Sequence, residues 1–321
     1  MRRIVSAMLI GVAAAAAAPV ARSQTAGALE VLPLRPNVYM VAGAGANVVV
    51  QVGEDGSVVV DSGAAGHTDA VIAAIRSMAD RPIRYVINTS ADPDHVGGNE
   101  PLSKAGQTLL QPRTIALPAS FLGSAASILA AEKVLTRMSV STGATPAYPT
   151  AAWPTETFDY GRKYMYLNGE GIEVLHQPAA HTDGDSIVFF RRSDVIVAGD
   201  LIDIDHFPVI DVDRGGSIQG LVAALNRVVG LAIPSVPIVS REEGTLVIPG
   251  HGRVLDQLDV VAYRDMVTIV RDRIRDLRAA GRSLDEVKAT RPARGYTREF
   301  GDASATAFVE AVYRSLAGGA A

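Results

Sequence analysis

The sequence predicts an α/β fold, because short apolar strands and amphipathic helices alternate in both halves of the chain. The predicted strands are short, apolar and bounded by glycine or turn residues: 37–43, 47–53, 57–63, 83–88, 163–169, 171–178, 186–192, 194–200 and 245–252. Loops rich in Asp, His and Gly follow several of them. Because open α/β sheets bind ligands at strand ends, these loops are the first candidates for a functional site.

The first half opens with three valine-rich stretches, "NVYMVAG", "NVVVQVG" and "SVVVDSG", separated by glycine and by the turn "EDG". They predict an antiparallel meander. The segment 67–80 then places apolar residues at helical spacing and predicts an amphipathic helix. Its apolar positions are Val71, Ile72, Ile75 and Met78. The strand "IRYVIN" follows this helix and runs into the loop "NTSADPDHVGGN".

The middle of the chain, 124–154, is rich in alanine at its start and in Pro and Thr at its end. It predicts a helix followed by an excursion over the surface. Further helices are predicted at 217–230, 260–281 and near 304–316. The buried candidates of the long helix recur at helical spacing: Val267, Val270, Ile274 and Leu277.

Composition bounds the class of protein. The chain has 321 residues, 48% of them hydrophobic, and a net charge of −4, which favours one large globular domain and argues against nucleic-acid binding. It has no Cys, so it forms no disulfide and offers no thiolate to a metal. Any metal must therefore be held by His, Asp, Glu or backbone oxygen.

The N-terminus carries Arg2 and Arg3, then an apolar stretch, then small residues ending near "ARSQ". This pattern predicts a signal peptide over 1–23 and a mature domain over 24–321, located in the periplasm or secreted. The arginine pair is compatible with twin-arginine export. A membrane anchor is the alternative for this stretch, but we expect none in the mature protein.

Four segments place metal-type donors beside glycine at predicted strand ends: "DPDHVGG", "HTDGDS", "VIVAGD" and "VIPGHG". Each alone has an ordinary explanation as a turn, a cap or a core histidine. Together they are more specific, because three of the six histidines fall in these loops. They predict a metal centre.

The order and spacing of these segments resemble the metallo-β-lactamase superfamily, whose signature is His-x-His-x-Asp-His, then a His, an Asp and a final His. The resemblance implies a four-layer αββα sandwich, with a core over about 38–252 and a C-terminal helical extension over about 257–321. It also implies that Asp61, in "VVVDSG", orients the first metal loop.

Carried over position by position, the resemblance makes Asp94, His95 and His251 ligands of one metal, with Asp200 bridging to a second metal that His181 binds. The first two histidines of the signature fall on Ser90 and Asp92. The hydroxyl of Ser90 is a poor ligand, and the carboxylate of Asp92 lowers the Lewis acidity of a cation that it binds.

We therefore expect one firm Zn²⁺ at Asp94, His95, Asp200 and His251, and a second metal at Asp92, His181 and Asp200 that is weak, different or absent. Mn or Fe would suit the oxygen-rich donors. Asp94 is also the candidate proton acceptor from the attacking water. Asp92 could instead bond only its own turn. His206 could contact substrate, act as a spare ligand or lie on the surface.

The resemblance favours a secreted metal-dependent hydrolase of a small ester, lactone, lactam or thioester, acting through metal-activated water. Two alternatives stay open. The altered motif could mark a catalytically weak or inactive relative that binds a ligand or partner, and the oxygen-rich donors could serve an iron-dependent sulfur oxidoreductase. The expected partner is a small-molecule substrate, whose specificity we expect to lie in loops such as 142–154.

Overall fold

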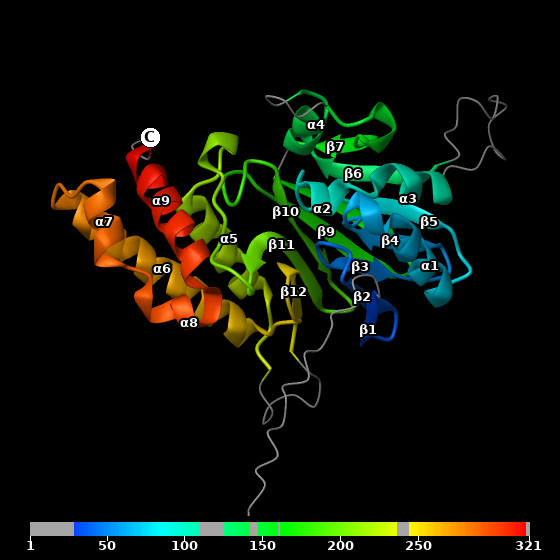
Figure 1. Cartoon of the computed structure of the whole chain (residues 1–321). Coiled ribbons are helices and arrows are strands. Elements are labelled where there is room, and N and C mark those ends of the chain that lie inside the picture. Colours follow the sequence, from blue (N-terminus) through cyan, green and yellow to red (C-terminus); the bar gives the residue numbers. More distant parts are fainter. Residues whose placement is uncertain (1–28, 110–124, 142–146, 160, 236–243, 319–321) are drawn as a thin grey trace, which may run out of the picture.

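The computed structural model describes residues 29–109, 125–141, 147–159, 161–235 and 244–318. The predicted signal peptide lies outside them. Within the described residues the chain forms two β-sheets that pack face to face, with helices on both outer surfaces (Figure 1). No helix in this part of the chain is both long and apolar enough to span a bilayer.

The first sheet has seven strands in sequence order, β1 to β7. The bounds of its strands are Glu30–Arg35 (β1), Val38–Ala42 (β2), Val48–Gln51 (β3), Ser57–Val60 (β4), Ile83–Ile87 (β5), Ser127–Ala131 (β6) and Glu156–Phe158 (β7). Strands β1 to β4 pair antiparallel, which confirms the meander predicted for β2, β3 and β4. Strands β4 to β7 pair parallel, so the loops after β4 and β5 leave the sheet at the same edge.

The second sheet has five strands in the order β12-β11-β10-β9-β8. Their bounds are Arg162–Leu167 (β8), Glu170–Gln177 (β9), Asp185–Phe190 (β10), Val195–Asp203 (β11) and Leu246–His251 (β12). Only β11 and β12 pair parallel. The candidate metal donors of this sheet lie in the loop after β9, inside β11 and at the carboxyl end of β12.

Helices complete the outer layers. Those of the first half are α1 (Thr68–Met78), α2 (Pro93–Val96), α3 (Asn99–Ala105) and α4 (Glu132–Met138). Those of the second half are α5 (Ile218–Leu231), α6 (Gln257–Ala279), α7 (Leu284–Thr290), α8 (Thr297–Phe300) and α9 (Asp302–Gly318). Short 3-10 helices are η1 (Ala65–His67), η3 (Thr150–Ala152), η4 (Val212–Arg214) and η5 (Arg294–Tyr296).

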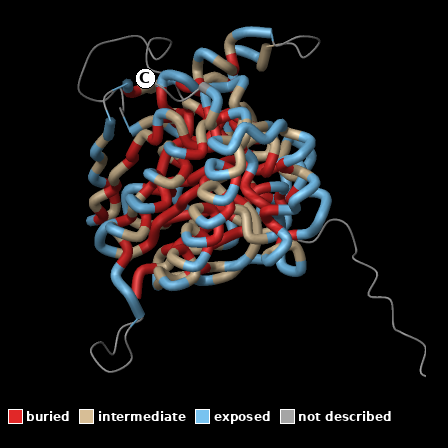
Figure 2. Tube along the Cα trace, turned by 90° about the vertical axis from the view of Figure 1, so that its left-hand side faces the viewer, coloured by how far each residue is buried: buried red, intermediate tan, exposed pale blue. Residues whose placement is uncertain are grey.

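Alternation along the valine-rich strands builds the layers. In β4, Val58 and Val60 face the second sheet, whereas Val59 faces the opposite way, towards α1 and Ile75. Both faces of the strand are therefore buried, as expected for a sheet covered on two sides. Figure 2 shows the result as a buried interior of strands surrounded by partly exposed helices and loops.

Helices α5, α6 and α9 pack on the outer face of the second sheet, and their buried residues share one cluster with β10 and β11. Of the predicted buried positions of α6, Val267, Val270 and Ile274 are buried, and Leu277 is partly buried at the edge of the same cluster. Together with the helices on the first sheet, this gives the four-layer αββα sandwich that the resemblance implied.

The prediction for 124–154 was wrong in part. A helix does form there, α4, but it is preceded by the parallel strand β6, which the alanine-rich sequence concealed. Four of the five residues of β6 are buried, so the strand lacks the polar-apolar alternation that identifies half-exposed strands. The short strands β1 and β7 were also missed.

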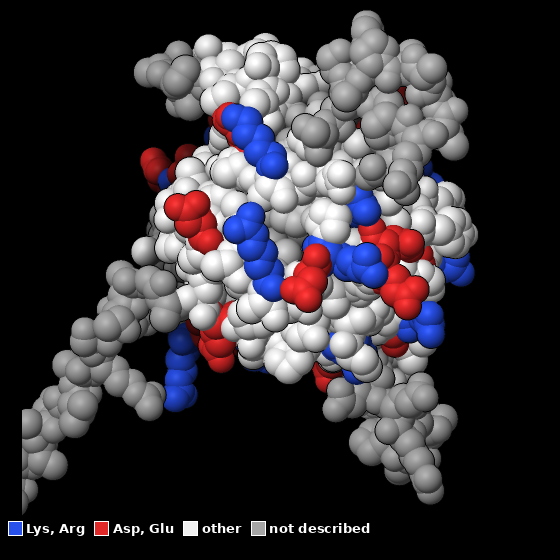
Figure 3. All heavy atoms as spheres, turned by 90° about the vertical axis from the view of Figure 1, so that its right-hand side faces the viewer, with Lys and Arg blue, Asp and Glu red and all other residues white. Residues whose placement is uncertain are grey.

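The face of the molecule in Figure 3 carries charges of both signs. Lys and Arg side chains lie next to Asp and Glu side chains over the described part of this face, in keeping with the net charge of −4. An extended basic field, which nucleic-acid phosphates require, is not present on the part of this face that is described.

Candidate metal centre

Six side chains with metal-type donors converge at the edge where the two sheets end. They form a first group, Asp94, His95 and His251, and a second group, Asp92, His181 and Asp200. Within each group, one ligand atom from each residue lies within 4.8 Å of the others. All six belong to the segments that the sequence singled out.

The loop after β5 supplies three of the six. Its chain turns into α2 at Pro93, whose fixed φ and missing N–H suit the first position of a helix. Asp92 precedes the helix with extended backbone, and its carbonyl accepts the backbone N–H of His95 at 2.9 Å. The tight turn presents Asp94 and His95 to the first group and leaves Asp92 to the second.

Asp200 lies inside β11 rather than at the end of the strand, at a point where the pairing with β12 is irregular. Two glycines make room for it. Gly199 has a φ of 55°, and a Cβ on Gly250 would lie 2.4 Å from Oδ1 of Asp200. Larger residues at these positions would displace the carboxylate, so the "AGD" and "PGHG" segments are shaped around it.

Asp200 contacts the imidazoles of the first group as well as belonging to the second. Its Oδ1 lies 3.0 Å from Nε2 of His95 and 3.6 Å from Nε2 of His251. His251 Nε2 is also 3.1 Å from Oδ2 of Asp94. Asp200 therefore lies between the two groups, where a bridging ligand would have to lie.

Asp61 fixes the orientation of His95. Its Oδ2 lies 2.8 Å from His95 Nδ1, and both side chains are buried. The same carboxylate accepts the backbone N–H and the hydroxyl of Thr89, at 2.8 and 2.7 Å. With Nδ1 occupied in this way, the ring presents Nε2 to the first group, as is usual for a metal-ligating histidine.

The electrostatics of the first group favour a cation. Burial by itself would lower the pKa of His95, but Asp200 and Asp61 outweigh it and raise that pKa well above its usual value. The hydrogen bond to Asp94 raises the pKa of His251 and lowers that of Asp94. The surrounding carboxylates thus favour positive charge on the imidazoles, as they would favour a bound cation.

The second group shows the same pattern. Burial opposes protonation of His181, but the carboxylates of Asp185, Asp200 and Asp92 raise its pKa to about 9. Its Nε2 is 3.5 Å from Oδ2 of Asp92. Its Nδ1 is 3.4 Å from Oδ1 of Asp185 without hydrogen-bond geometry, so this buried nitrogen has no hydrogen-bond partner among the described residues.

The donor set fits a divalent cation. Three carboxylates and three imidazoles share one small region, and the sequence supplies no thiolate. Because imidazole binds a metal in its neutral form, cation binding at these histidines would compete with their protonation. Such nitrogen and oxygen donors suit Zn²⁺, Mn²⁺ or Fe²⁺ and do not distinguish among them.

The other predicted residues lie as follows. Ser90 is buried, and its Oγ accepts the backbone N–H of Asp92 at 3.1 Å, so it supports the loop and belongs to neither group. The side chain of Asp92 makes no capping bond to its own turn and points to His181 and Arg214 instead. His206 is 66% exposed, lies 3.4 Å from Asp203 and belongs to neither group.

Within the "HTDGDS" loop, Asp185 has a local structural role. It accepts the backbone N–H and the hydroxyl of Thr182 at 2.7 and 2.9 Å. These bonds fix the turn that follows His181. Asp183 also helps to hold this loop, since it pairs with Arg137.

Three residues beside the site escaped sequence reasoning. Arg214 pairs with Asp92 at 2.6 Å, and Arg137 donates to Asp183 and to the carbonyl of Arg214. Burial, followed by the charges of Asp92 and Asp94, raises the pKa of Tyr148. No spacing rule links these residues to the donors, and an arginine in the glycine-containing segment "DVDRGGS" was the only signal.

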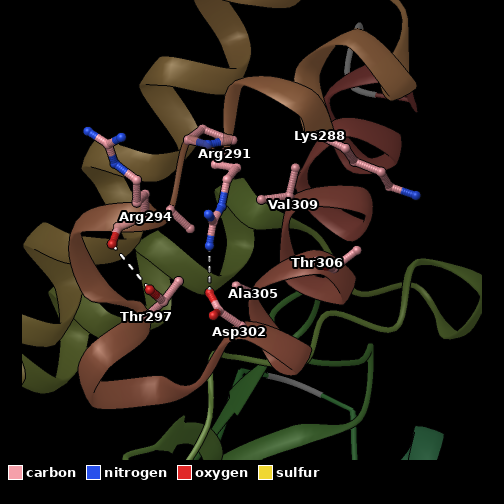
Figure 4. A pocket seen from close by; sticks show the side chains of 10 residues that line it. Lys288, Arg291, Arg294, Thr297, Asp302, Ala305, Thr306 and Val309 are labelled. Atoms are coloured by element: carbon pink, nitrogen blue, oxygen red, sulfur yellow. Dashed lines mark hydrogen bonds and ion pairs between the residues drawn. The ribbon is translucent and has the colours of Figure 1, made fainter.

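Apart from the donor groups, a concavity of about 240 Å³ lies among α7, η5 and α9 (Figure 4). Its lining includes Arg291, which pairs with Asp302 at 3.1 Å, and Lys288, which pairs with Glu310 at 2.5 Å. Neither donor group of the metal centre touches it. Its paired charges give no sign of a catalytic site.

Comparisons with known proteins agree with this fold. Solved structures with the same fold include a metallo-beta-lactamase from Pontibacter korlensis, at 16% identity over 75% of this chain and 99% of that one, with a TM-score of 0.55. DIM-1 metallo-beta-lactamase matches at 14% identity over 75% of this chain and 97% of that one, with a TM-score of 0.55.

The stereoselective inverting sec-alkylsulfatase Pisa1 from Pseudomonas sp. matches at 14% identity and a TM-score of 0.62, over 91% of this chain but only 51% of that one. None of the curated proteins compared with the chain matches it. The model of the metallo-beta-lactamase superfamily matches residues 41–251, which span all six donors. The chain therefore belongs to the metallo-β-lactamase superfamily.

Proposed function

We propose that this protein is an exported metal-dependent hydrolase that cleaves a small ester, lactone, lactam or thioester. Members of its superfamily are metal-dependent hydrolases. The observation that carries the proposal is the convergence of six donors from four loops, with His95 already oriented by Asp61. Export follows from the signal peptide predicted over 1–23.

Asp94, His95, His251 and Asp200 would hold one cation, and Zn²⁺ is our first candidate. When bound, such a cation supplies Lewis acidity, which polarises the scissile carbonyl and lowers the pKa of water. Asp61 keeps Nε2 of His95 directed into the group through its bond to Nδ1. His251 and Asp94 already contact each other, so little rearrangement is needed to form the group.

Asp94 is our candidate for proton transfer. Its side chain is 32% exposed, so substrate and water can reach it, whereas His95 is fully buried. The hydrogen bond from His251 lowers the pKa of Asp94 and keeps it ionised. An ionised and accessible carboxylate can accept a proton from the attacking water and deliver it to the leaving group.

The test is a panel of chromogenic esters, lactones, lactams and thioesters, with a secondary alkyl sulfate added because of the sulfatase fold neighbour. We expect turnover of at least one substrate, abolished by a chelator and restored by Zn²⁺. His251→Ala should remove it, and His67→Ala, a histidine in neither group, is the matched control. If no substrate shows chelator-sensitive turnover, the proposal is wrong.

One observation favours a second candidate, a catalytically weak relative that binds a ligand or a partner at the same site. Asp92 already pairs with Arg214, so a carboxylate that a second cation needs is engaged. Replacing Ser90 and Asp92 together by histidine separates the two candidates. A large gain in hydrolysis would favour the weak relative, whereas an unchanged or lower rate would favour a site already adapted to one cation.

A further inference from the structure

Arg214 holds the one donor that distinguishes this site from the superfamily signature. Its Nη1 lies 2.6 Å from Oδ1 of Asp92, whose side chain is only 13% exposed. The other oxygen of Asp92, Oδ2, lies 3.5 Å from Nε2 of His181. Asp92 therefore lies between the permanent positive charge of Arg214 and His181 of the second donor group.

The position of Arg214 is fixed by its own loop. Asp211 accepts the backbone N–H of Arg214 at 2.9 Å and its Nε at 2.5 Å. The backbone N–H of Asp211 in turn bonds to the carbonyl of His181 at 2.9 Å, and that of Asp183 bonds to the carbonyl of Arg214 at 3.0 Å. The Arg214 loop is thus hydrogen-bonded directly to the loop that carries His181.

A glycine makes this close approach possible. A Cβ on Gly216 would lie 2.1 Å from the carbonyl oxygen of His181, so the chain can pass here only without a side chain. The carbonyl of Arg214 also accepts a bond from Arg137. The guanidinium is therefore held beside Asp92 by a network of backbone and side-chain bonds rather than by a single surface ion pair.

The two donor groups differ in this respect. Among the described residues, no Lys or Arg pairs with Asp94, His95 or His251. In the second group, a cation would need an oxygen of Asp92 and would then face the guanidinium of Arg214. Because like charges at short range repel strongly in a partly buried site, the guanidinium opposes a cation there and not in the first group.

We propose that the guanidinium of Arg214 pairs with Asp92 and takes the place of a second cation. Tight cation binding is thereby restricted to the site formed by the first group and Asp200. This rests on the proposed function only in taking the first group as a metal site. The role of Arg214 is positioning and exclusion. It sets how many cations the protein holds.

The test is Zn²⁺ titration of the metal-free full chain against a chromophoric chelator, with bound metal counted by mass spectrometry. We expect the wild type to hold one equivalent tightly. R214Q should gain a second site at least about tenfold tighter than any second site of the wild type. R191Q, which removes an arginine paired with Glu173, is the matched control and should behave as wild type.

Two further variants test the role of Asp92. R214Q/D92N should return to one tight equivalent, because the released carboxylate is the ligand that the second cation uses. D92N alone should bind Zn²⁺ at its tight site with an affinity within about threefold of wild type, because Asp92 pairs with Arg214 and is not a ligand of that site. Circular dichroism would reveal whether R214Q folds. If it does not, D92N still tests the role of Arg214, because a tight site that is tenfold weaker in D92N overturns the proposal.

The outcomes separate this inference from the proposed function. If the wild type binds two Zn²⁺ equally tightly, or if R214Q gains no second site, the role of Arg214 is wrong while the hydrolase proposal stands. If the wild type binds no divalent cation tightly, both proposals fall. Every readout is metal binding, so none depends on finding the substrate.

Discussion

Asp61 and His95 form a buried pair, with Oδ2 of the carboxylate 2.8 Å from Nδ1 of the imidazole. The pair joins the end of β4 to the loop after β5, and it leaves Nε2 of His95 directed at Asp200. Asp61 adopts a left-handed backbone conformation, with a φ of 60°. An unusual backbone conformation is thus retained at the residue that orients a metal-type donor.

Asp61→Asn tests this orientation. Asn tolerates the left-handed conformation, so the change removes mainly the negative charge behind His95. We expect the affinity for Zn²⁺ to fall about 10- to 100-fold, as measured by chelator competition. Asp194→Asn is the matched control, since Asp194 also has a positive φ of 53° and accepts a threonine hydroxyl, from Thr245. Equal Zn²⁺ affinities for D61N and wild type would contradict the role of Asp61 in orienting His95 for the metal.

Gly250→Ala should displace Asp200. The new Cβ would lie 2.4 Å from Oδ1 of Asp200, so the carboxylate must move away from His95. We expect lost Zn²⁺ affinity and a cost of about 1–3 kcal/mol in the free energy of unfolding. Gly230→Ala in α5 is the control. It meets no atom within 4 Å and should stabilise the protein by about 0.5–1 kcal/mol, because alanine favours helix. Unaltered metal binding in G250A would contradict the packing argument.

His206→Ala should leave the cation site intact. The side chain is 66% exposed and belongs to neither donor group. We expect Zn²⁺ affinity within about threefold of wild type, because surface side chains away from a site contribute little. Once a substrate is found, an increase in KM at constant kcat would assign His206 to substrate binding. A tenfold loss of metal affinity would show that the histidine reaches the cation after all.

Asp259 gives the first turn of α6 a pH-dependent contribution to stability. Arg253 pairs with Asp259 at 2.8 Å, and the carboxylate of Asp259 also accepts the backbone N–H of Asp256. These two contacts lower the pKa of Asp259. A lowered pKa in the folded state stabilises the protein above pH 3.8, and this stabilisation is lost as the pH falls through the folded value.

We therefore expect Asp259→Asn to reduce the free energy of unfolding at pH 7 by about 0.5–1 kcal/mol, since the side chain is 32% exposed. The difference from wild type should shrink towards zero as the pH is lowered below 3.8. Urea unfolding at a series of pH values measures it. Asp265→Asn, an exposed position in the same helix, is the control, and a D259N deficit that persists unchanged in acid would contradict the charge argument.

Much of the fold could be predicted because its strands carry strong local signals. The valine-rich meander, helix α1 and the long helix α6 follow from periodicity and turn residues. β6 could not be predicted in this way. A strand buried on both faces and rich in alanine has the same local composition as a buried helix, so only its neighbours β5 and β7 determine its conformation.

The sequence by itself determined the donor types and their order, because four segments that place Asp or His beside glycine are together more specific than any one of them. It also determined the departure at Ser90 and Asp92. Only the tertiary structure decided that Asp200 lies between the two groups and that Arg214 engages Asp92. These relationships join residues more than 100 positions apart, and such distances are set by how two sheets pack rather than by any local pattern.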